Sequence, residues 1–131
     1  MKTENRRGQF EFQQEIKALF CEMAAEVDAV VVEGHRDREA LRTLGYDGPV
    51  LLASGNGCNR ADFVESIAER HRTVALLTDF DREGRALAAR LRGRLERSGV
   101  KVAAEWRNRL RDLLDGTGCR AVEGLKGLAE E

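Results

Sequence analysis

Two stretches of sequence decide the fold: AVVVEG at residues 29–34 and VALLTDFDREG at residues 74–84. Each begins with a short apolar run and then changes abruptly to acidic residues and glycine. Short apolar runs that are rich in β-branched residues and bounded by turn signals predict buried strands. Two further runs of this kind, at residues 50–53 and 100–103, bring the predicted strands to four.

Helical patterns separate these strands. Apolar residues recur at spacings of three and four in residues 10–26, 60–70 and 83–97, and residues 37–44 predict a shorter helix that ends at Gly45. Apolar strands that alternate with helices are typical of a parallel sheet covered on both faces. The sequence therefore predicts a Rossmann-like α/β fold with a four-stranded parallel sheet, and right-handed crossovers allow the strand order 2-1-3-4.

The domain organisation follows from these patterns. We expect an N-terminal helical extension at residues 1–26, the α/β domain at residues 27–104 and a helical tail at residues 105–131 packed on the same domain. The tail contains two predicted helices, at residues 106–114 and 122–129. A chain of 131 residues can bury a core without disulfides or a structural metal.

The remaining composition argues against several other classes of protein. The three cysteines are widely spaced and form no CxxC pair, which disfavours a zinc site and a disulfide framework. The apolar runs are far shorter than the roughly twenty residues of a membrane span. The first residues, MKTENRRGQFEF, do not resemble a signal peptide, so we expect a cytoplasmic location and no membrane partner.

The formal net charge of −1 conceals a strong separation of charge along the chain. Residues 82–111 contain ten basic and three acidic residues, a net charge of +7, whereas the remainder contains twelve basic and twenty acidic residues, a net charge of −8. In residues 83–97 three leucines are spaced to face the core, while Arg90, Arg94 and Arg97 share another face. Such a basic segment is typical of a nucleic-acid-binding surface, although solvated helix faces would produce the same pattern.

Acidic residues follow two of the predicted strands. Glu33 comes directly after the first strand, and Asp79 and Asp81 come after the third. With the order 2-1-3-4 these strands are neighbours, and ligands of open parallel sheets bind at the carboxyl edge where strand order reverses. Carboxylates crowded at one edge repel each other and favour a bound cation, and hard oxygen ligands suit magnesium. The alternative is that the aspartates only form a turn and a helix N-cap, and that Glu83 interacts with the helix dipole.

The motif VVVEG, followed by Asp37, and the motif LTDFDREG resemble the two signatures of the Toprim domain. This domain is shared by type IA and type II topoisomerases, bacterial primases, several nucleases and the small ribonuclease that matures 5S ribosomal RNA. The resemblance covers about residues 28–104, and the overall size is similar to that of stand-alone archaeal Toprim proteins.

The resemblance implies a Toprim fold and roles for individual residues. Glu33 would act in acid/base chemistry or in metal binding, and Asp79 and Asp81 would hold magnesium, with Glu83 as a further ligand. One or two Mg²⁺ ions are implied, with Mn²⁺ as a substitute. Candidate phosphate-binding or nucleic-acid-binding residues at the same edge are Gly34, His35, Arg36, Asp37, Ser54, Gly55, Arg82 and Arg85.

We therefore expect a magnesium-dependent nuclease that acts on structured RNA, with RNA favoured over DNA only through the similarity to the ribosomal-RNA nuclease. Tyr46, the only tyrosine, precedes the second strand and is expected to be a packing residue at the opposite edge rather than a nucleophile. Two alternatives stay open: a catalytically silent Toprim module that binds nucleic acid or a ribonucleoprotein, and a receiver-like phosphoacceptor domain. The receiver-like alternative is weaker, because receiver domains carry an acidic pair after the first strand.

Overall fold

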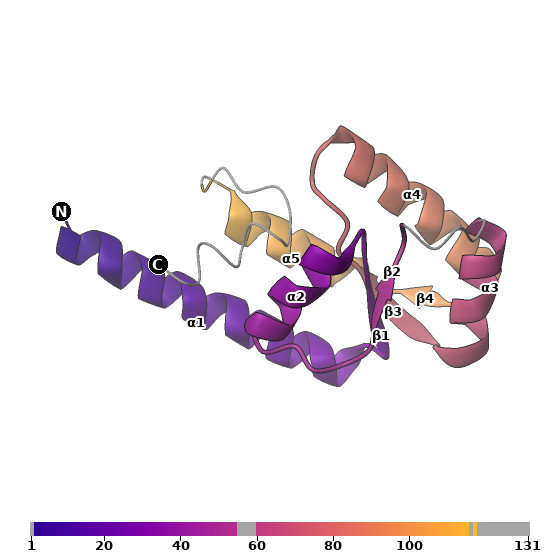
Figure 1. Ribbon diagram of the computed structural model, residues 1–131, viewed down its shortest axis with the longest axis horizontal. Coiled ribbons are helices and arrows are strands. Elements are labelled where there is room, and N and C mark those ends of the chain that lie inside the picture. The colour runs from indigo at the N-terminus through magenta and orange to yellow at the C-terminus, as the bar shows by residue number, and fades with distance from the viewer. Residues whose placement is uncertain (1, 55–59, 116, 118–131) are drawn as a thin grey trace.

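A parallel sheet covered by helices on both faces forms the body of the molecule (Figure 1). The computed structural model describes residues 2–54, 60–115 and 117. Within these residues the strands are β1 (Ala29–Val32), β2 (Val50–Leu52), β3 (Thr73–Leu76) and β4 (Lys101–Val102). Their order is β2-β1-β3-β4 and every pairing is parallel, which confirms the α/β class and the predicted order 2-1-3-4.

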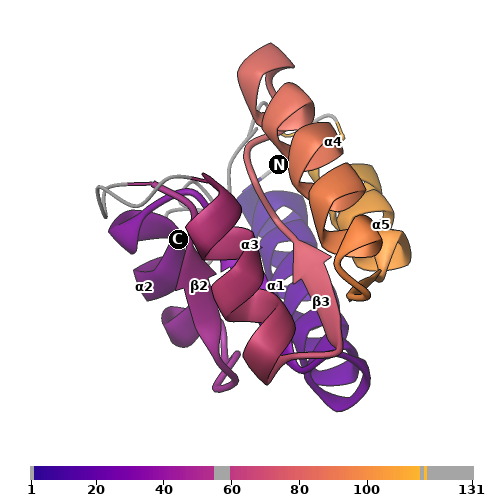
Figure 2. The same cartoon turned by 90° about the vertical axis from the view of Figure 1, so that its right-hand side faces the viewer.

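The helices lie in two layers, one on each face of the sheet (Figure 2). They are α1 (Lys2–Glu26), α2 (His35–Thr43), α3 (Arg60–Arg70), α4 (Arg82–Arg97) and α5 (Ala104–Leu114). Side chains of α1, α2 and α5 join the core on one face, and those of α3 and α4 join the core on the other. Within β1, Val30 and Val32 belong to the first core and Ala29 and Val31 to the second. The run is apolar throughout because successive side chains of a strand point to opposite faces and both faces are covered.

The first core joins the N-terminal helix to the last described helix. Phe20 and Met23 of α1 are fully buried in the same cluster as Trp106 and Leu110 of α5. Burial of a large apolar side chain contributes about 1.5–3 kcal/mol. The apolar residues that gave the amphipathic pattern at residues 10–26 therefore form the surface with which α1 packs against α5 and the sheet.

The second core contains the face of α4 that the leucine spacing predicted. Leu91 and Leu95 are buried against Ile67 of α3, and Leu87 is partly buried beside them. Tyr46 belongs to the first core, where its hydroxyl donates to the carbonyl of Pro49 at 3.2 Å, so it is a packing residue as expected.

Several helices begin earlier than the apolar spacing predicted, because polar residues form their first turns. α2 begins at His35 rather than Asp37, and the Asp37 carboxylate accepts the N–H of Gly34 at 3.2 Å, which stabilises that first turn. α4 begins at Arg82 and α5 at Ala104, one and two residues before their predicted starts. The predicted helix at residues 122–129 lies outside the described residues.

Candidate functional site

Glu33 and Asp79 meet at the carboxyl edge of the sheet, between β1 and β3. The two strands pair with Val31 opposite Leu76, and the N–H of Leu77 donates to the carbonyl of Val31 at 2.8 Å. The two strands therefore end side by side at this edge of the sheet. The Glu33 carboxylate accepts the backbone N–H of Asp79 at 2.7 Å, and the two side chains also share a hydrogen bond. The structure therefore brings together the first two acidic residues that the sequence singled out.

The environment of Asp79 disfavours its charged form. Burial and the nearby negative charges of Glu33, Asp37 and Asp81, together with the hydrogen bond to Glu33, raise the pKa of Asp79 from 3.8 to about 7. Asp79 therefore changes its charge near neutral pH. Such a concentration of negative charge favours a bound proton or cation.

Asp81 forms the N-cap of α4. Its Oδ1 accepts the N–H of Gly84 at 2.7 Å, while the residue itself is exposed. The N-cap that the sequence offered as an alternative role is thus present. A carboxylate has two oxygens, and the cap engages one of them, so the cap is compatible with a further ligand at Asp81.

Asp37 is an acidic residue that the fold buries, with 6% of its surface exposed. It lies in the first turn of α2 and accepts the Gly34 N–H, and its charge is the third contribution that raises the pKa of Asp79. Glu83, by contrast, is exposed in the first turn of α4 and is not among the carboxylates that chiefly raise this pKa. The ligand role of Glu83 stays a prediction.

Arg107 of α5 holds the segment that follows β3. Its guanidinium donates to the carbonyls of Thr78 at 2.6 Å and Asp79 at 2.9 Å, and lies 4.4 Å from the centre of the Phe80 ring. Burial lowers the pKa of Arg107, while the negative charges of Glu33 and Asp79 act in the opposite direction. The sequence predicts Arg107 only as part of the basic segment, because the contact joins positions 28 residues apart and leaves no local pattern.

Gly84 lets α4 begin directly against the backbone of Asp79. A Cβ atom at position 84 would lie 2.0 Å from the carbonyl oxygen of Asp79 and 2.8 Å from its Cα. The buried Thr78 hydroxyl donates to the carbonyl of Gly84 at 2.7 Å. This hydrogen bond holds the first turn of α4 against the segment that follows β3. Glycine is therefore required where the acidic loop enters the helix.

The remaining candidate residues surround this edge. The backbone N–H of Ser54 donates to the carbonyl of Glu33 at 3.1 Å, and its hydroxyl donates to the same oxygen. His35 is exposed and its Nδ1 lies 2.9 Å from a guanidinium nitrogen of Arg38. The first turn of α4 exposes Arg82 and Arg85, and Arg36 is exposed at the start of α2. Gly55 lies outside the described residues.

The donor set fits a magnesium ion chemically. Within residues 2–54, 60–115 and 117, no three His, Cys, Asp or Glu side chains are already arranged to enclose a metal ion. Magnesium, however, commonly takes one or two carboxylates and completes its shell with water and substrate phosphate. Asp79 and Asp81 supply oxygen donors at an edge where the negative charge of four acidic residues accumulates. The residues present therefore match the kind of site that the Toprim resemblance implies.

Comparison with known proteins identifies the family. The model of the Toprim domain matches residues 28–105. The chain belongs to the Toprim domain family. Membership of this family points to a metal-dependent function related to nucleic acids, and it leaves the receiver-like alternative without support. The family match also includes the two acidic motifs and the strands that carry them.

Relatives of this Toprim protein occur in several archaea. A UPF0292 protein of Methanosarcina barkeri is 34% identical over 91% of this chain and 81% of its own length. UPF0292 proteins of Methanocaldococcus jannaschii and Thermococcus gammatolerans are 36% and 39% identical, over 77% and 76% of this chain and 77% and 72% of their own lengths. These matches confirm the similarity to small archaeal Toprim proteins.

A solved structure has the same fold. A protein from Aquifex aeolicus superposes with a TM-score of 0.64 and 24% sequence identity, covering 87% of this chain and 94% of that one. In the part of the Toprim protein that the structure describes, no helix is long and apolar enough to cross a membrane.

Proposed function

We propose that this Toprim protein is a magnesium-dependent nuclease that cleaves phosphodiester bonds in structured RNA. The observation that carries the proposal is the hydrogen-bonded pair of Glu33 and Asp79, which joins β1 to β3 at an edge flanked by the exposed Arg82 and Arg85. Carboxylates that can hold a divalent cation, beside basic groups that can bind phosphate, are the combination that metal-dependent phosphodiester chemistry uses. We propose a cytoplasmic location.

Each side chain has a distinct task in this proposal. Asp79 and Asp81 would hold the magnesium ion, which would supply positive charge where negative charge develops on the phosphate. Glu33 orients the attacking water and accepts its proton, and the N–H of Asp79 fixes the orientation of the Glu33 carboxylate. Arg82 and Arg85 bind the phosphate oxygens through charge-assisted hydrogen bonds.

Arg107 is a positioning residue in the proposed reaction. Its hydrogen bonds go to the backbone carbonyls of Thr78 and Asp79, so it acts on the acidic loop rather than on the substrate. The preference for RNA over DNA is based on the resemblance to the nuclease that matures ribosomal RNA. A DNA duplex is therefore a necessary comparison in the test.

The proposal is tested by incubating a 5′-labelled hairpin RNA with the protein in Mg²⁺ or in EDTA. We expect cleavage only with Mg²⁺, and a loss of about 100-fold or more in Glu33→Gln, because general acid–base groups commonly contribute that much. Asp79→Asn should show a comparable loss. Glu39→Gln is the matched control, since Glu39 is exposed on α2 and has no part in the proposed reaction.

The possible outcomes separate the alternatives. Equal cleavage by the wild type, Glu33→Gln and Asp79→Asn would overturn the assignment of the active site. Salt-sensitive RNA binding without magnesium-dependent cleavage in any variant would instead support the catalytically silent module. Faster cleavage of the DNA duplex than of the hairpin RNA would reverse the substrate preference.

A further inference from the structure

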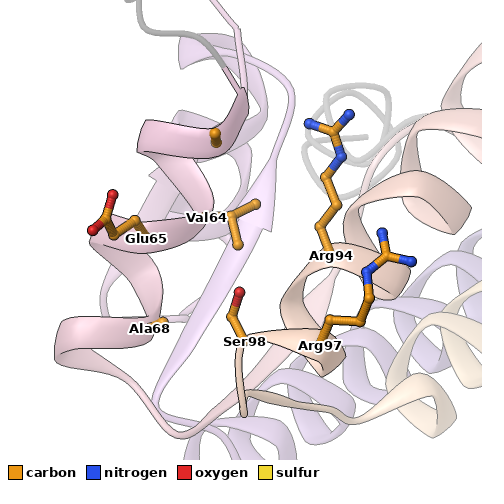
Figure 3. A pocket seen from close by; sticks show the side chains of 7 residues that line it. Val64, Glu65, Ala68, Arg94, Arg97 and Ser98 are labelled. Atoms are coloured by element: carbon orange, nitrogen blue, oxygen red, sulfur yellow. The ribbon is translucent and has the colours of Figure 1, made fainter.

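A groove separates α3 from the C-terminal half of α4, on the face of the sheet opposite α1 and α5 (Figure 3). Its volume is about 620 Å³, and the small side chains of Ala61, Val64 and Ala68 form the α3 wall. Arg94, Arg97 and Ser98 form the α4 wall. Figure 3 shows the guanidinium groups of Arg94 and Arg97 extending in the same direction from this wall.

The two arginines differ from half of the other basic residues of the segment 82–111. Four of the ten are engaged within the molecule: Arg92 with Glu96 at 3.3 Å, Arg109 with Glu22 at 2.7 Å, Arg111 with Asp112 at 3.6 Å, and Arg107 with backbone carbonyls. In the part of the chain that the structure describes, neither Arg94 nor Arg97 has an acidic partner. Both guanidinium groups are thus available to an external anion.

Glu65 is the acidic residue that borders the groove. Its carboxylate points to the far side of α3, away from both guanidinium groups, and it forms no ion pair with them (Figure 3). The groove therefore has an apolar wall on α3, and two positive charges lie along its α4 side. This combination suits a strand whose phosphates contact arginine and whose sugars contact apolar side chains, because guanidinium groups bind phosphate with two parallel hydrogen bonds.

The groove is connected to the acidic edge by α4 itself. Asp81 caps the start of this helix, and Arg94 lies thirteen residues further along it. At 1.5 Å per residue the separation along the axis is about 20 Å. In B-form DNA one strand carries a phosphate about every 3.4 Å of helix axis, so a duplex that lay along α4 would cover the separation with roughly six nucleotides. An acidic peptide would also match the charge of the groove, but the continuity with the proposed cleavage site favours nucleic acid.

We infer that the α3/α4 groove, defined by Ala61, Val64, Ala68, Arg94 and Arg97, is a second phosphate-binding site. A duplex that lay along α4 would contact this site roughly six nucleotides from the bond at the acidic edge. The inference rests on the proposed function for its choice of partner. Its test is a binding measurement that needs no catalysis.

The test measures fluorescence anisotropy of a labelled 16-base-pair RNA duplex in EDTA, over a range of salt concentrations. We expect Arg94→Ala/Arg97→Ala to bind about tenfold or more weakly, and its slope of log affinity against log salt to fall by about 1.4–1.8, which is two phosphate contacts. Arg94→Lys/Arg97→Lys should recover the slope but only part of the affinity, since lysine lacks the paired donors of arginine.

The matched control is Lys17→Ala/Arg42→Ala, which removes the same charge from exposed residues of α1 and α2, on the opposite face of the sheet and outside the basic segment 82–111. It should bind within about twofold of the wild type if the contact is local rather than a general charge effect. Equal losses in the two double variants would overturn the inference. The inference would also be overturned, in favour of an acidic peptide as the ligand, if Arg94→Ala/Arg97→Ala bound the RNA duplex as the wild type does but no longer bound poly-glutamate.

The hairpin cleavage assay, run on the same proteins, separates this inference from the proposed function. If binding depended on Arg94 and Arg97 but none of the proteins cleaved the hairpin, the proposed nuclease activity would be overturned and the phosphate-binding role of the groove would be supported. Cleavage by the wild type, with Arg94→Ala/Arg97→Ala unchanged in both binding and cleavage, would overturn the groove alone. Circular dichroism of each double variant confirms folding, which exposed or half-buried side chains at these positions should permit.

Discussion

At the scale of single residues, Asp79 has the most unusual environment in the candidate site. It is partly buried, it is hydrogen-bonded to another carboxyl group, and its backbone N–H is already committed to that same group. The fold therefore holds two acidic side chains together at a cost that a solvated pair would not incur. Sites that carry such a cost are commonly functional.

The raised pKa of Asp79 predicts a specific dependence of stability on pH. Because the pKa is about 7 in the folded protein and 3.8 in the unfolded chain, the folded state binds the proton more tightly. This contribution to stability is full below pH 3.8, decreases as the pH rises towards 7 and is absent above that value. We expect Asp79→Asn to raise the Tm more at pH 8 than at pH 4, since an amide can donate to Glu33 and carries no charge.

Thermal unfolding of the wild type and Asp79→Asn at both pH values measures this difference, and titrating groups that do not interact with Asp79 cancel in the comparison. Glu39→Gln, an exposed carboxylate on α2, is the control and should shift the Tm equally at the two pH values. A difference between wild type and Asp79→Asn that does not change with pH would contradict the raised pKa.

At the scale of elements, α4 carries two glycines in very different surroundings. Gly84 packs against the backbone of Asp79, whereas a Cβ at Gly93 would meet only the end of the Arg97 side chain, at 3.9 Å. A glycine inside a helix costs about 0.5–1 kcal/mol relative to alanine. The cost at Gly84 is offset by the close approach that it permits, and Gly93 has no such compensation.

We therefore predict opposite effects for the same substitution on one helix. Gly84→Ala should lower the free energy of unfolding by about 1–3 kcal/mol, because the new methyl group would overlap the Asp79 carbonyl. It should also abolish cleavage. Gly93→Ala should raise the free energy of unfolding by up to about 1 kcal/mol.

Urea denaturation of both variants provides the measurement, with Gly93→Ala as the internal control for helix propensity. Equal stabilisation by the two substitutions would show that α4 can move away from Asp79, and would contradict the tight approach seen at Gly84.

The same helix shows what the sequence could and could not predict. The leucine spacing predicted the core face of α4, because apolar residues on the buried face of a helix recur every three or four positions in the sequence. The contact between Gly84 and Asp79 is also local, but only the three-dimensional structure shows that it is tight. Arg107 was missed as a site residue because α5 reaches the acidic loop through tertiary packing. The strand order was predictable since the handedness of crossovers leaves few topologies.

At the scale of the whole molecule, the larger core connects the N-terminal helix to the candidate site. α1 packs on α5 through Phe20, Met23, Trp106 and Leu110, and α5 extends Arg107 to the carbonyls of Thr78 and Asp79. The helices outside the acidic motifs therefore do more than cover the sheet: they supply the guanidinium that fixes the acidic loop.

Arg107→Ala should consequently disturb both stability and the proposed activity. Removal of the guanidinium leaves backbone carbonyls without their donor, at a cost of about 1–3 kcal/mol in the free energy of unfolding. Arg107→Lys should recover little of it, because one ammonium cannot reproduce the two-armed contact. Urea denaturation and the hairpin assay measure the two effects.

The control for this prediction is Arg109→Ala, two residues along the same helix. Arg109 is 47% exposed, pairs with Glu22 on the surface and lies 4.9 Å from the centre of the Trp106 ring, and each of these contacts contributes about 0–1 kcal/mol. If Arg109→Ala were as damaging as Arg107→Ala, loss of positive charge rather than loss of the loop contacts would explain the effect.

The continuity of α4 has one more consequence, for changes in chain length. The helix runs unbroken from Arg82 to Arg97, so the number of residues in it sets both the distance and the rotation between the acidic edge and the groove. One inserted residue would turn Arg94 and Arg97 by about 100° around the axis and direct them away from α3. An insertion of about one full turn, three or four residues, nearly restores the direction and lengthens the span by roughly 5 Å. The protein can therefore change the reach of this helix only in steps of whole turns.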